Sequence, residues 1–291
     1  MAPFGRSGLS SFAHDTHRVL SGTSGIWTAG RHGLSRVDGD PLSWRSHAVR
    51  VVDNIWNLRL SWRMLIEPRH DADADPHIPR ESVRIPEVIP IFSLPTVVFF
   101  PRTYLPLHIF EPRYREMVAD IAQEGQCIGM ALLKEGWESD YHGNPPVYET
   151  GCVGRLLNVQ LFSDGRSNII LQGLERYEIK EEVTDRRYRR ARIALKPLKG
   201  DKTLAGSVRS HLLDQLKRYT ATRDNSHVWQ EFLGQEISDE SLVHTVSSHL
   251  DCTPLERQFL LEADTLSIQA RRLIDLLHFM LHEYRTARGR G

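Results

Sequence analysis

The spacing of hydrophobic residues changes near residue 200, and this change constrains the fold more than any other feature of the chain. From Val88 to about Leu198, short apolar runs are separated by prolines, glycines and polar clusters, a pattern typical of strands and turns. After Gly200 the apolar residues recur at helical spacing, for example at Leu212 and Leu216. Strands first and helices afterwards predict an α+β chain. We expect a small β-barrel or packed-sheet subdomain with one inserted helix, followed by a C-terminal helical bundle.

The strand-rich part is expected to hold several strands and one helix. Strands are predicted at residues 88–94, 96–100, 104–110, 127–133, 152–162, 167–173, 174–183 and 189–198, and the helix at residues 111–124. Asp164-Gly165, between two of these runs, predicts a hairpin with a type I′ turn, which needs positive φ at both central positions. In the helical part, Ser238 is expected to open one helix and Thr253 another, the latter through a capping box with Glu256.

Residues 1–83 differ in composition from the rest of the chain. They are rich in Gly, Ser, Arg and His, and they contain no lysine. Their only sustained hydrophobic period, at residues 51–66, favours a helix that Pro68 ends. We expect this segment to be disordered or a non-native extension, and Met64 leaves open whether residues 1–63 are translated. The folded part then divides into a β-rich subdomain at residues 84–200 and a helical subdomain at residues 201–288.

The charge balance argues against some classes of partner. Lys plus Arg and Asp plus Glu both number 37, so the chain has no net charge that would attract nucleic acid or an anionic membrane. No apolar run approaches the roughly 20 residues that span a bilayer. The N-terminus lacks the apolar core of a secretory signal. We therefore expect a cytoplasmic protein that binds neither nucleic acid nor membrane.

The cysteines and histidines do not predict a metal or redox site. Cys127, Cys152 and Cys252 are widely spaced and include no CxxC pair, so reduced thiols are expected. The histidine pairs in the first 80 residues have no partner at metal-ligand spacing. Cys152 as a nucleophile would need an oriented histidine, whereas its place in a predicted strand favours a small buried side chain. No cofactor is expected.

Several ordered motifs give the folded part a recognisable signature. The first runs from Ile89 as IPIFSLPTVVFFPRTYLPLHIFEPRYREMV and contains PLHIFEPRY at residues 106–114. The others are YETGCVG from Tyr148, DGR from Asp164 with LQGLERY from Leu171, and the helical segments 250–261 and 271–283. Together these motifs resemble the N-terminal (substrate-binding) domain family of Lon protease, over about residues 84–285.

The resemblance implies a set of structural signature residues. They are Pro106, Leu107, Phe110, Glu111, Arg113, Tyr114, Gly151, Asp164, Gly165, Gly173 and Arg176. We expect Glu111 and Arg113 to pair locally and to cap the following helix, because an acidic residue in a first turn complements the helix dipole. The alternative is a charged clamp for a ligand. Arg176 and Tyr177 are expected to be structural strand residues.

Departures from the full-length Lon protease bear on catalysis. A phosphate-binding loop GxxxxGK[ST] holds nucleotide phosphates with its backbone N–H groups and its lysine, yet no Gly-Lys dipeptide occurs in this chain. The Ser-Lys segment of the protease is also missing, and three isolated cysteines cannot build the zinc modules of some eukaryotic relatives. The resemblance therefore implies a stand-alone recognition domain that is not an enzyme.

A binding function is the remaining class, and aromatic residues are its candidates. Exposed sheet edges accept extended chains through backbone hydrogen bonds. The candidate polypeptide-binding residues are Phe99, Phe100, Tyr104, His108 and Tyr114. The alternative for the aromatic four is that they fill the core, and for His108 that it is a surface or hydrogen-bonded histidine.

The leading hypothesis is a module that recognises unfolded or exposed polypeptide segments in protein quality control. One alternative is a regulatory or adaptor subunit that docks on a folded protease or another folded partner. A second alternative is a small-molecule-binding barrel, which would need a deep apolar pocket with a few convergent polar groups. The oligomeric state is left open.

Overall fold

The computed structural model describes residues 27–30, 33–36, 49–51, 84–124, 127–141, 143–222, 226–234 and 236–288. The chain separates into two compact units, Met1–Ser46 and His47–Gly291. In the first unit, β1 (Trp27–Gly30) and β2 (Gly33–Arg36) pair as an antiparallel two-stranded sheet. The predicted helix at residues 51–66, and most of the segment predicted to be disordered, lie outside the described residues.

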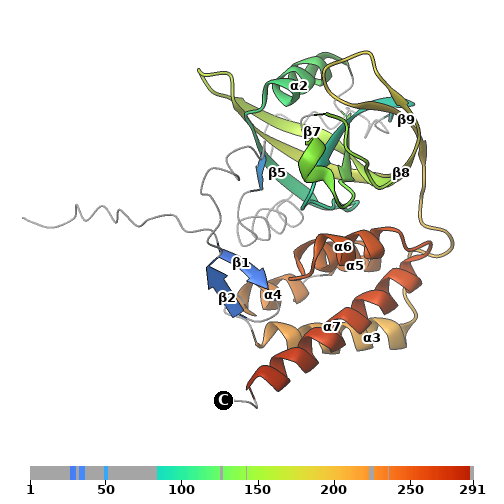
Figure 1. Cartoon of the computed structure of the whole chain (residues 1–291). Helices are drawn as coiled ribbons and strands as arrows, with labels where there is room; N and C mark the ends of the chain where they lie inside the picture. The colour runs from blue at the N-terminus through green and yellow to red at the C-terminus, as the bar shows by residue number, and fades with distance from the viewer. Residues whose placement is uncertain are drawn as a thin grey trace, which may run out of the picture. The chain divides into compact units, whose positions relative to one another are not determined.

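One seven-stranded sheet forms the first part of the second unit (Figure 1). Its strands are β3 (Val49–Val51), β4 (Val88–Leu94), β5 (Tyr104–Ile109), β6 (Cys127–Leu132), β7 (Thr150–Leu161), β8 (Ser167–Val183) and β9 (Arg190–Leu195). They lie in the order β3-β5-β8-β7-β6-β4-β9, and only β4 and β6 pair in parallel. The long strand β8 also pairs with β9, so the sheet curls back on itself.

Helix α2 (Pro112–Glu124) is inserted between β5 and β6, where the sequence predicted one helix. Its apolar residues recur three or four positions apart, and they are buried in the same core as the inner face of the sheet. These residues are Tyr114, Met117, Val118 and Ile121. A short 3₁₀ helix, η1 (Trp137–Asp140), follows β6. We call this part of the molecule, from Val88 to Leu195, the sheet region.

The segment 96–100 was predicted to be a strand, and this was wrong, because its residues belong to no strand. Its side chains nevertheless alternate. Val97 and Phe99 are buried in the core of the sheet region, whereas Val98 and Phe100 are buried in a second core formed by the helices. Residues 97–100 are all apolar because they lie between two cores, so their hydrophobicity does not reflect pairing with a neighbouring strand, whereas Thr96 is polar and exposed.

Gly173 was predicted to lie between two strands, but a single strand, β8, runs through it. The glycine is needed there because a Cβ atom would lie 2.1 Å from the carbonyl oxygen of Phe100. The backbone of the 100–103 segment is bonded to it directly: Arg102 N–H donates to Gly173 O (2.8 Å) and Gly173 N–H to Thr103 O (2.9 Å). The glycine therefore marks a close approach of two backbones and does not end the strand.

The hairpin between β7 and β8 lies where Asp164-Gly165 predicted it, but the type I′ turn was wrong. Of these two residues only Gly165 has a positive φ, at 79°. Gly165 N–H donates to Phe162 O (3.0 Å), and Phe162 N–H donates to Arg166 O (2.8 Å). This is the pattern of a three-residue loop that ends with a glycine in the left-handed region, the next most common hairpin connection.

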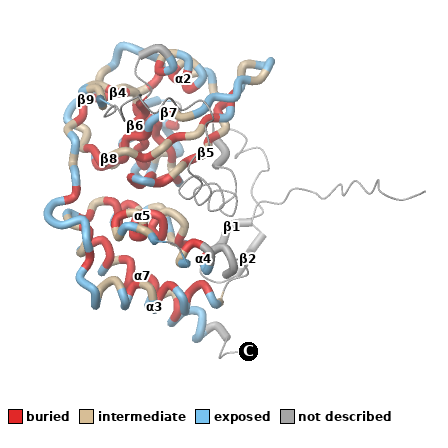
Figure 2. Tube along the Cα trace, turned by 180° about the vertical axis from the view of Figure 1, so that it is seen from behind, coloured by how far each residue is buried: buried red, intermediate tan, exposed pale blue. Residues whose placement is uncertain are grey.

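The rest of the second unit is helical, as predicted. The helices are α3 (Gly206–Thr220), α4 (Ser226–Leu233), α5 (Asp239–His249), α6 (Pro254–Leu261) and α7 (Leu266–Arg288). Ser238 caps α5, and Thr253 and Glu256 form the expected capping box at the start of α6. Helix α7 packs against α3, α5 and α6 around the second core (Figure 2). We call this part, from Gly206 to Arg288, the helical region.

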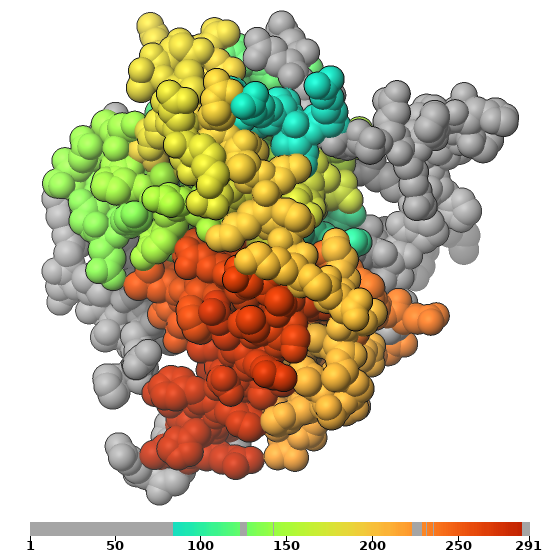
Figure 3. Space-filling view, turned by 90° about the vertical axis from the view of Figure 1, so that its right-hand side faces the viewer, coloured from blue at the N-terminus to red at the C-terminus, as the bar shows by residue number. Residues whose placement is uncertain are grey.

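Direct contacts join the sheet region to the helical region. The chain between β9 and α3 runs over their junction (Figure 3). Arg176 in β8 is buried and donates to the carbonyl oxygens of Leu261 (2.8 Å) and Ala263. Gln258 of α6 donates to Thr150 O in β7 at 2.9 Å. The α+β fold class is thus confirmed, with the two regions held together by buried polar groups.

Candidate functional site

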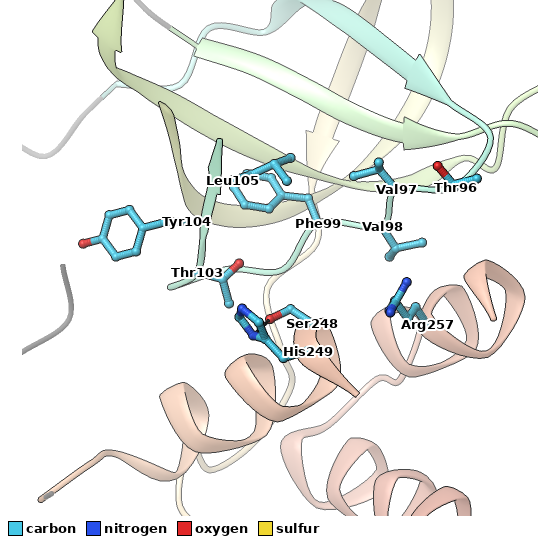
Figure 4. A pocket seen from close by; sticks show the side chains of 10 residues that line it. All are labelled: Thr96, Val97, Val98, Phe99, Thr103, Tyr104, Leu105, Ser248, His249 and Arg257. Carbon is cyan, nitrogen blue, oxygen red and sulfur yellow. Dashed lines mark hydrogen bonds between the residues drawn. The ribbon is translucent and has the colours of Figure 1, made fainter. Parts of the chain in front are cut away.

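A cavity of about 150 Å³ lies where the segment between β4 and β5 faces α5 and α6 (Figure 4). It is lined by Thr96, Val97, Val98, Phe99, Thr103, Tyr104, Leu105, Ser248, His249 and Arg257. One wall comes from the sheet region and is mainly apolar. The other wall comes from the helical region and is polar. The cavity therefore exists only where the two regions meet.

The apolar wall is fixed by backbone contacts of the 100–103 segment. Thr103 Oγ1 donates to Phe100 O at 2.7 Å. Arg102 has a φ of 60°, in the left-handed region that non-glycine residues seldom adopt. Its side chain forms an ion pair with Glu240 of α5, with 2.6 Å between Nε and Oε2. The strained residue thus connects the wall to the helix on the opposite side.

Glu240 remains charged at this junction. Burial raises the pKa of its carboxyl group, but the neighbouring cations Arg102 and Lys202 lower it more, and the net pKa is below its usual value. Lys202 Nζ lies 3.4 Å from Oε1 of the same carboxylate. The ion pairs therefore hold the 100–103 segment against α5 most strongly near neutral pH.

The polar wall is built at the end of α5 and the start of α6. Ser248 Oγ donates to Thr245 O at 2.9 Å. His249 Nδ1 lies 2.9 Å from the same carbonyl oxygen and 2.7 Å from Ser248 Oγ. Arg257 extends from α6 toward Val98, and its Nη2 donates to Leu250 O at 2.9 Å. The positions of all three side chains are thus set by main-chain carbonyl oxygens.

The size of the cavity limits what it can hold. Sites for drug-sized molecules and cofactors usually measure about 300–1,000 Å³, so this cavity is suited to a single side chain. The lining residues include no carboxylate. Among the residues that the structure describes, no group of three or more His, Cys, Asp or Glu side chains is placed to hold a metal ion.

The candidate binding residues predicted from the sequence are not brought together in one site. Phe99 and Tyr114 are buried in the sheet-region core, with 3% and 2% of their surface exposed, and Phe100 is fully buried in the helical core. Phe99 and Tyr104 line the cavity. His108 lies at the other end of β5, where its Nδ1 is 2.8 Å from Asn168 Oδ1.

Three of the five residues are buried in cores. Phe99, Phe100 and Tyr114 fill cores, which was the alternative left open, so a client could contact them only through the cavity or after unpacking. Tyr104 and His108 are half-buried and accessible. The tyrosine hydroxyl accepts a hydrogen bond from Gln172 Nε2 at 3.3 Å.

The signature residues have structural positions. Arg113 Nε lies 2.7 Å from Glu111 Oε1, as local pairing predicts, and the backbone oxygen of Glu111 accepts from the N–H of Tyr114 at 3.1 Å. Both charged side chains are largely buried. A Cβ atom on Gly151 would lie 2.3 Å from Met130 O, so this glycine also marks a close approach. The other signature residues lie in β5, at its end or in the β7–β8 hairpin.

Those other residues also contribute locally. Leu107 is buried in the sheet-region core and Phe110 packs against that core. Pro106 lies opposite Ile170 of β8. The Asp164 carboxylate accepts from Arg166 N–H at 3.0 Å, and this hydrogen bond contributes most to lowering its pKa. These residues therefore contribute to the packing and the turns of the sheet region.

The cysteines have the properties of structural thiols. Cys152 is fully buried in β7, and burial raises its pKa well above the ordinary value. Burial also raises the pKa of Cys127, and it raises that of Cys252 to about 11. A thiol with a raised pKa is protonated at neutral pH and is a poor nucleophile.

The residues that the sequence did not predict are Ser248, His249 and Arg257. They lie far along the chain from residues 96–105, and nothing in their own spacing distinguishes them from helix-surface residues. Only the packing of α5 and α6 against the sheet region places them at the cavity. Within the described part of the chain, no helix is both long enough and apolar enough to cross a membrane.

Comparisons with known proteins agree with the fold. A family model described as the ATP-dependent protease La (LON) substrate-binding domain matches residues 88–278. The Lon protease of Cytophaga hutchinsonii is 26% identical over 73% of this chain and 26% of its own length. Lon protease 2 of Myxococcus xanthus is 26% identical over 67% of this chain and 24% of its own length. The chain thus spans about a quarter of the length of these relatives.

A solved structure shows the same fold. The N-terminal domain of Mycobacterium avium complex Lon protease superposes with a TM-score of 0.51 and 15% sequence identity, over 66% of this chain and 98% of that one. The family model covers well over half of the 291 residues, from β4 into α7. The chain therefore belongs to the family of LON substrate-binding domains.

Proposed function

We propose that this chain recognises unfolded or exposed segments of other polypeptides and catalyses no reaction on them. The observation that carries the proposal is the cavity between residues 96–105 and the helices α5 and α6. It combines an apolar wall with a few fixed polar groups, as ligand sites do. Its volume of about 150 Å³ suits one side chain of a client.

Binding by a single site of this size is expected to be weak. An unfolded client loses conformational entropy when it is ordered, and this loss opposes the contacts that it gains. A dissociation constant on the order of micromolar, equivalent to about 8 kcal/mol, is the expected range. The family relationship supports the recognition of substrates, because the matched model describes a substrate-binding domain.

Fluorescence anisotropy with a labelled, unfolded casein-like protein tests the proposal. Thr96 is exposed and lines the cavity, so Thr96→Trp is designed to obstruct it. Ser163→Trp is the matched control, because Ser163 is exposed on the β7–β8 turn and does not line the cavity. We expect Thr96→Trp to weaken binding at least about tenfold, equivalent to about 1.4 kcal/mol. Equal affinities for both variants would contradict the site.

Docking on a folded partner is a second candidate, and one surface feature favours it. Leu255 and Phe259 on α6 and Ile268 on α7 are exposed large apolar residues. The Arg272 guanidinium lies 3.8 Å from the centre of the Phe259 ring. Aromatic and arginine side chains are enriched at protein interfaces. If Phe259→Ser abolished client binding and Thr96→Trp did not, this surface would be the site instead.

A further inference from the structure

The residues that line the cavity include a cation but no carboxylate. Of its ten lining residues, Arg257 carries a permanent positive charge, and His249 is the other titratable group on the polar wall, whereas no lining residue is acidic. Glu256, the neighbour of Arg257, is turned to the helix cap, where its Oε2 accepts from Thr253 N–H (2.7 Å) and Oγ1–H (2.8 Å). The acidic residue nearest in sequence is therefore engaged elsewhere.

Arg257 has hydrogen-bonding capacity that the fold does not use. A guanidinium group has five N–H donors. One of them binds Leu250 O, and the buried Nε has no hydrogen-bond partner. The neighbouring thiol of Cys252 does not neutralise the charge, because burial raises its pKa to about 11 and keeps it protonated. The guanidinium group lines the cavity and is only partly buried, so an anionic acceptor at this end of the cavity would bind favourably.

The apolar wall lies directly opposite this cation. Arg257 extends toward Val98, whose side chain points to α6, whereas Val97 and Phe99 point away from Arg257 into the sheet-region core (Figure 4). A ligand that fills the cavity must therefore present an apolar group to the sheet region and an anion to α6 within the length of one residue. The last residue of a polypeptide does so, because its side chain and its terminal carboxylate leave the same Cα atom.

We propose that the cavity binds the C-terminal residue of a client polypeptide, with its apolar side chain against Val98 and its terminal carboxylate on Arg257. This inference rests on the proposed function and specifies the class of client: chains whose free C-terminus ends in an apolar residue. Capture of a C-terminal carboxylate by a fixed set of donors is an established mode of peptide recognition. Arginine is well suited to it, because its planar donors match a carboxylate.

Short peptides with an N-terminal fluorescent label and a C-terminal leucine test the proposal by anisotropy. One peptide has a free terminal carboxylate, a second has a terminal amide, and a third has the amide but carries an internal aspartate beside the leucine. We expect the free acid to bind about tenfold more tightly than the amide, the size of a charge-assisted hydrogen bond. If the amide peptide with the internal aspartate bound as tightly as the free acid, the cavity would recognise a side-chain carboxylate as well as a terminal one. The proposal of a C-terminal site would then be wrong.

Variants of Arg257 test whether this residue is responsible for the preference for the free acid. Arg257→Gln should weaken binding of the acid peptide about tenfold and so remove most of its preference over the amide peptide, while Arg257→Lys should retain part of the preference because it keeps the charge. Arg271→Gln is the matched control, since Arg271 is exposed on α7 and does not line the cavity. Thermal denaturation followed by circular dichroism reports whether Arg257→Gln still folds.

The two proposals fail in different ways. If unfolded casein binds and Thr96→Trp weakens it, but the acid and amide peptides bind equally, the C-terminal preference is wrong and the proposed function stands. If neither casein nor any peptide binds to the folded protein, both are wrong. An equal loss of affinity in Arg257→Gln and Arg271→Gln would show an unspecific effect of charge and would also overturn the C-terminal site.

Discussion

His244 is a buried titratable residue at the contact between the sheet region and α5. It has no exposed surface, and its ring centre lies 6.2 Å from that of Phe100. Burial lowers its pKa to about 4. Glu240 acts in the opposite direction, whereas the nearby cations Arg176 and Arg102 lower the pKa further. The imidazole is therefore neutral in the folded protein at neutral pH.

The neutral imidazole makes stability depend on pH in a defined direction. In the unfolded chain a histidine has a pKa near 6.5, so below that pH the unfolded state binds a proton that the folded state does not. Stability is present above about pH 6.5 and is lost as the pH falls toward about 4. Glu240, whose pKa is lowered, contributes stability that is lost only as the pH falls through its own folded value. The range from pH 7 to pH 5 thus reports mainly on His244.

We predict that the free energy of unfolding falls by about 2 kcal/mol between pH 7 and pH 5 through His244 alone. Urea denaturation of the wild type and of His244→Leu at both pH values measures this contribution. The substitution should flatten the dependence, whereas His278→Leu, at an exposed position on α7, should not. The same pH dependence in wild type and His244→Leu would show that this residue is not the group that titrates.

Arg176 connects two secondary-structure elements that are far apart in the sequence. It extends from β8 to the carbonyl oxygens of Leu261 and Ala263, at the end of α6 and just after it. The carbonyl groups at a helix C-terminus lack partners within the helix, and a cation there also complements the helix dipole. A single arginine thus satisfies the end of α6 and attaches it to the sheet region.

We predict that Arg176→Met lowers the free energy of unfolding by about 3 kcal/mol, because it leaves buried carbonyl groups without their charged donor. Arg166→Met is the control, since the Arg166–Asp164 ion pair is about half exposed on both sides and should contribute less than about 1 kcal/mol. Denaturant unfolding measures both. A loss of similar size in the two variants would contradict the role of Arg176.

Secondary-structure elements set by local signals were predictable from the sequence, and those set by distant contacts were not. The capping box of Thr253 and Glu256 and the apolar stripe of α2 are local, and the structure has both. Residues 96–100 were predicted to be a strand because four of the five side chains are apolar, yet residues 97–100 are apolar because two cores enclose them. Gly173 was interpreted as the end of a strand. The structure requires a glycine there for another reason: the backbone of Phe100, which is far away in the sequence, approaches it closely.

The candidate site was predictable only in part for the same reason. Phe99 and Tyr104 stood out as aromatic residues in the signature segment, and both line the cavity. Arg257 carried no signal, because an arginine in the first turns of a helix is ordinarily a solvated residue. The cavity is a property of the whole unit, since its walls come from two regions that the sequence could describe only separately.

At the scale of the whole molecule, the weak affinity expected for the single proposed site bears on how the protein would act. A dissociation constant on the order of micromolar gives short-lived complexes unless several sites act together. When two binding sites are linked, occupation of the first raises the effective concentration of the client at the second without adding a contact. The overall avidity can then exceed the single-site affinity by about 10²–10⁴. The proposed recognition of clients would therefore be strengthened by oligomerisation or by attachment to a larger assembly.

We predict that the purified chain binds unfolded polypeptide but hydrolyses neither ATP nor peptide bonds. The sequence has no Gly-Lys dipeptide and hence no phosphate-binding loop of the usual kind. Burial keeps all three thiols protonated at neutral pH, so no cysteine is activated as a nucleophile. The measurement is ATPase and caseinolysis assays beside the anisotropy experiment, with Thr96→Trp included in each. ATP-dependent cleavage of casein by the pure protein would refute the non-catalytic role, and hydrolysis that Thr96→Trp abolished would place the chemistry at the cavity itself.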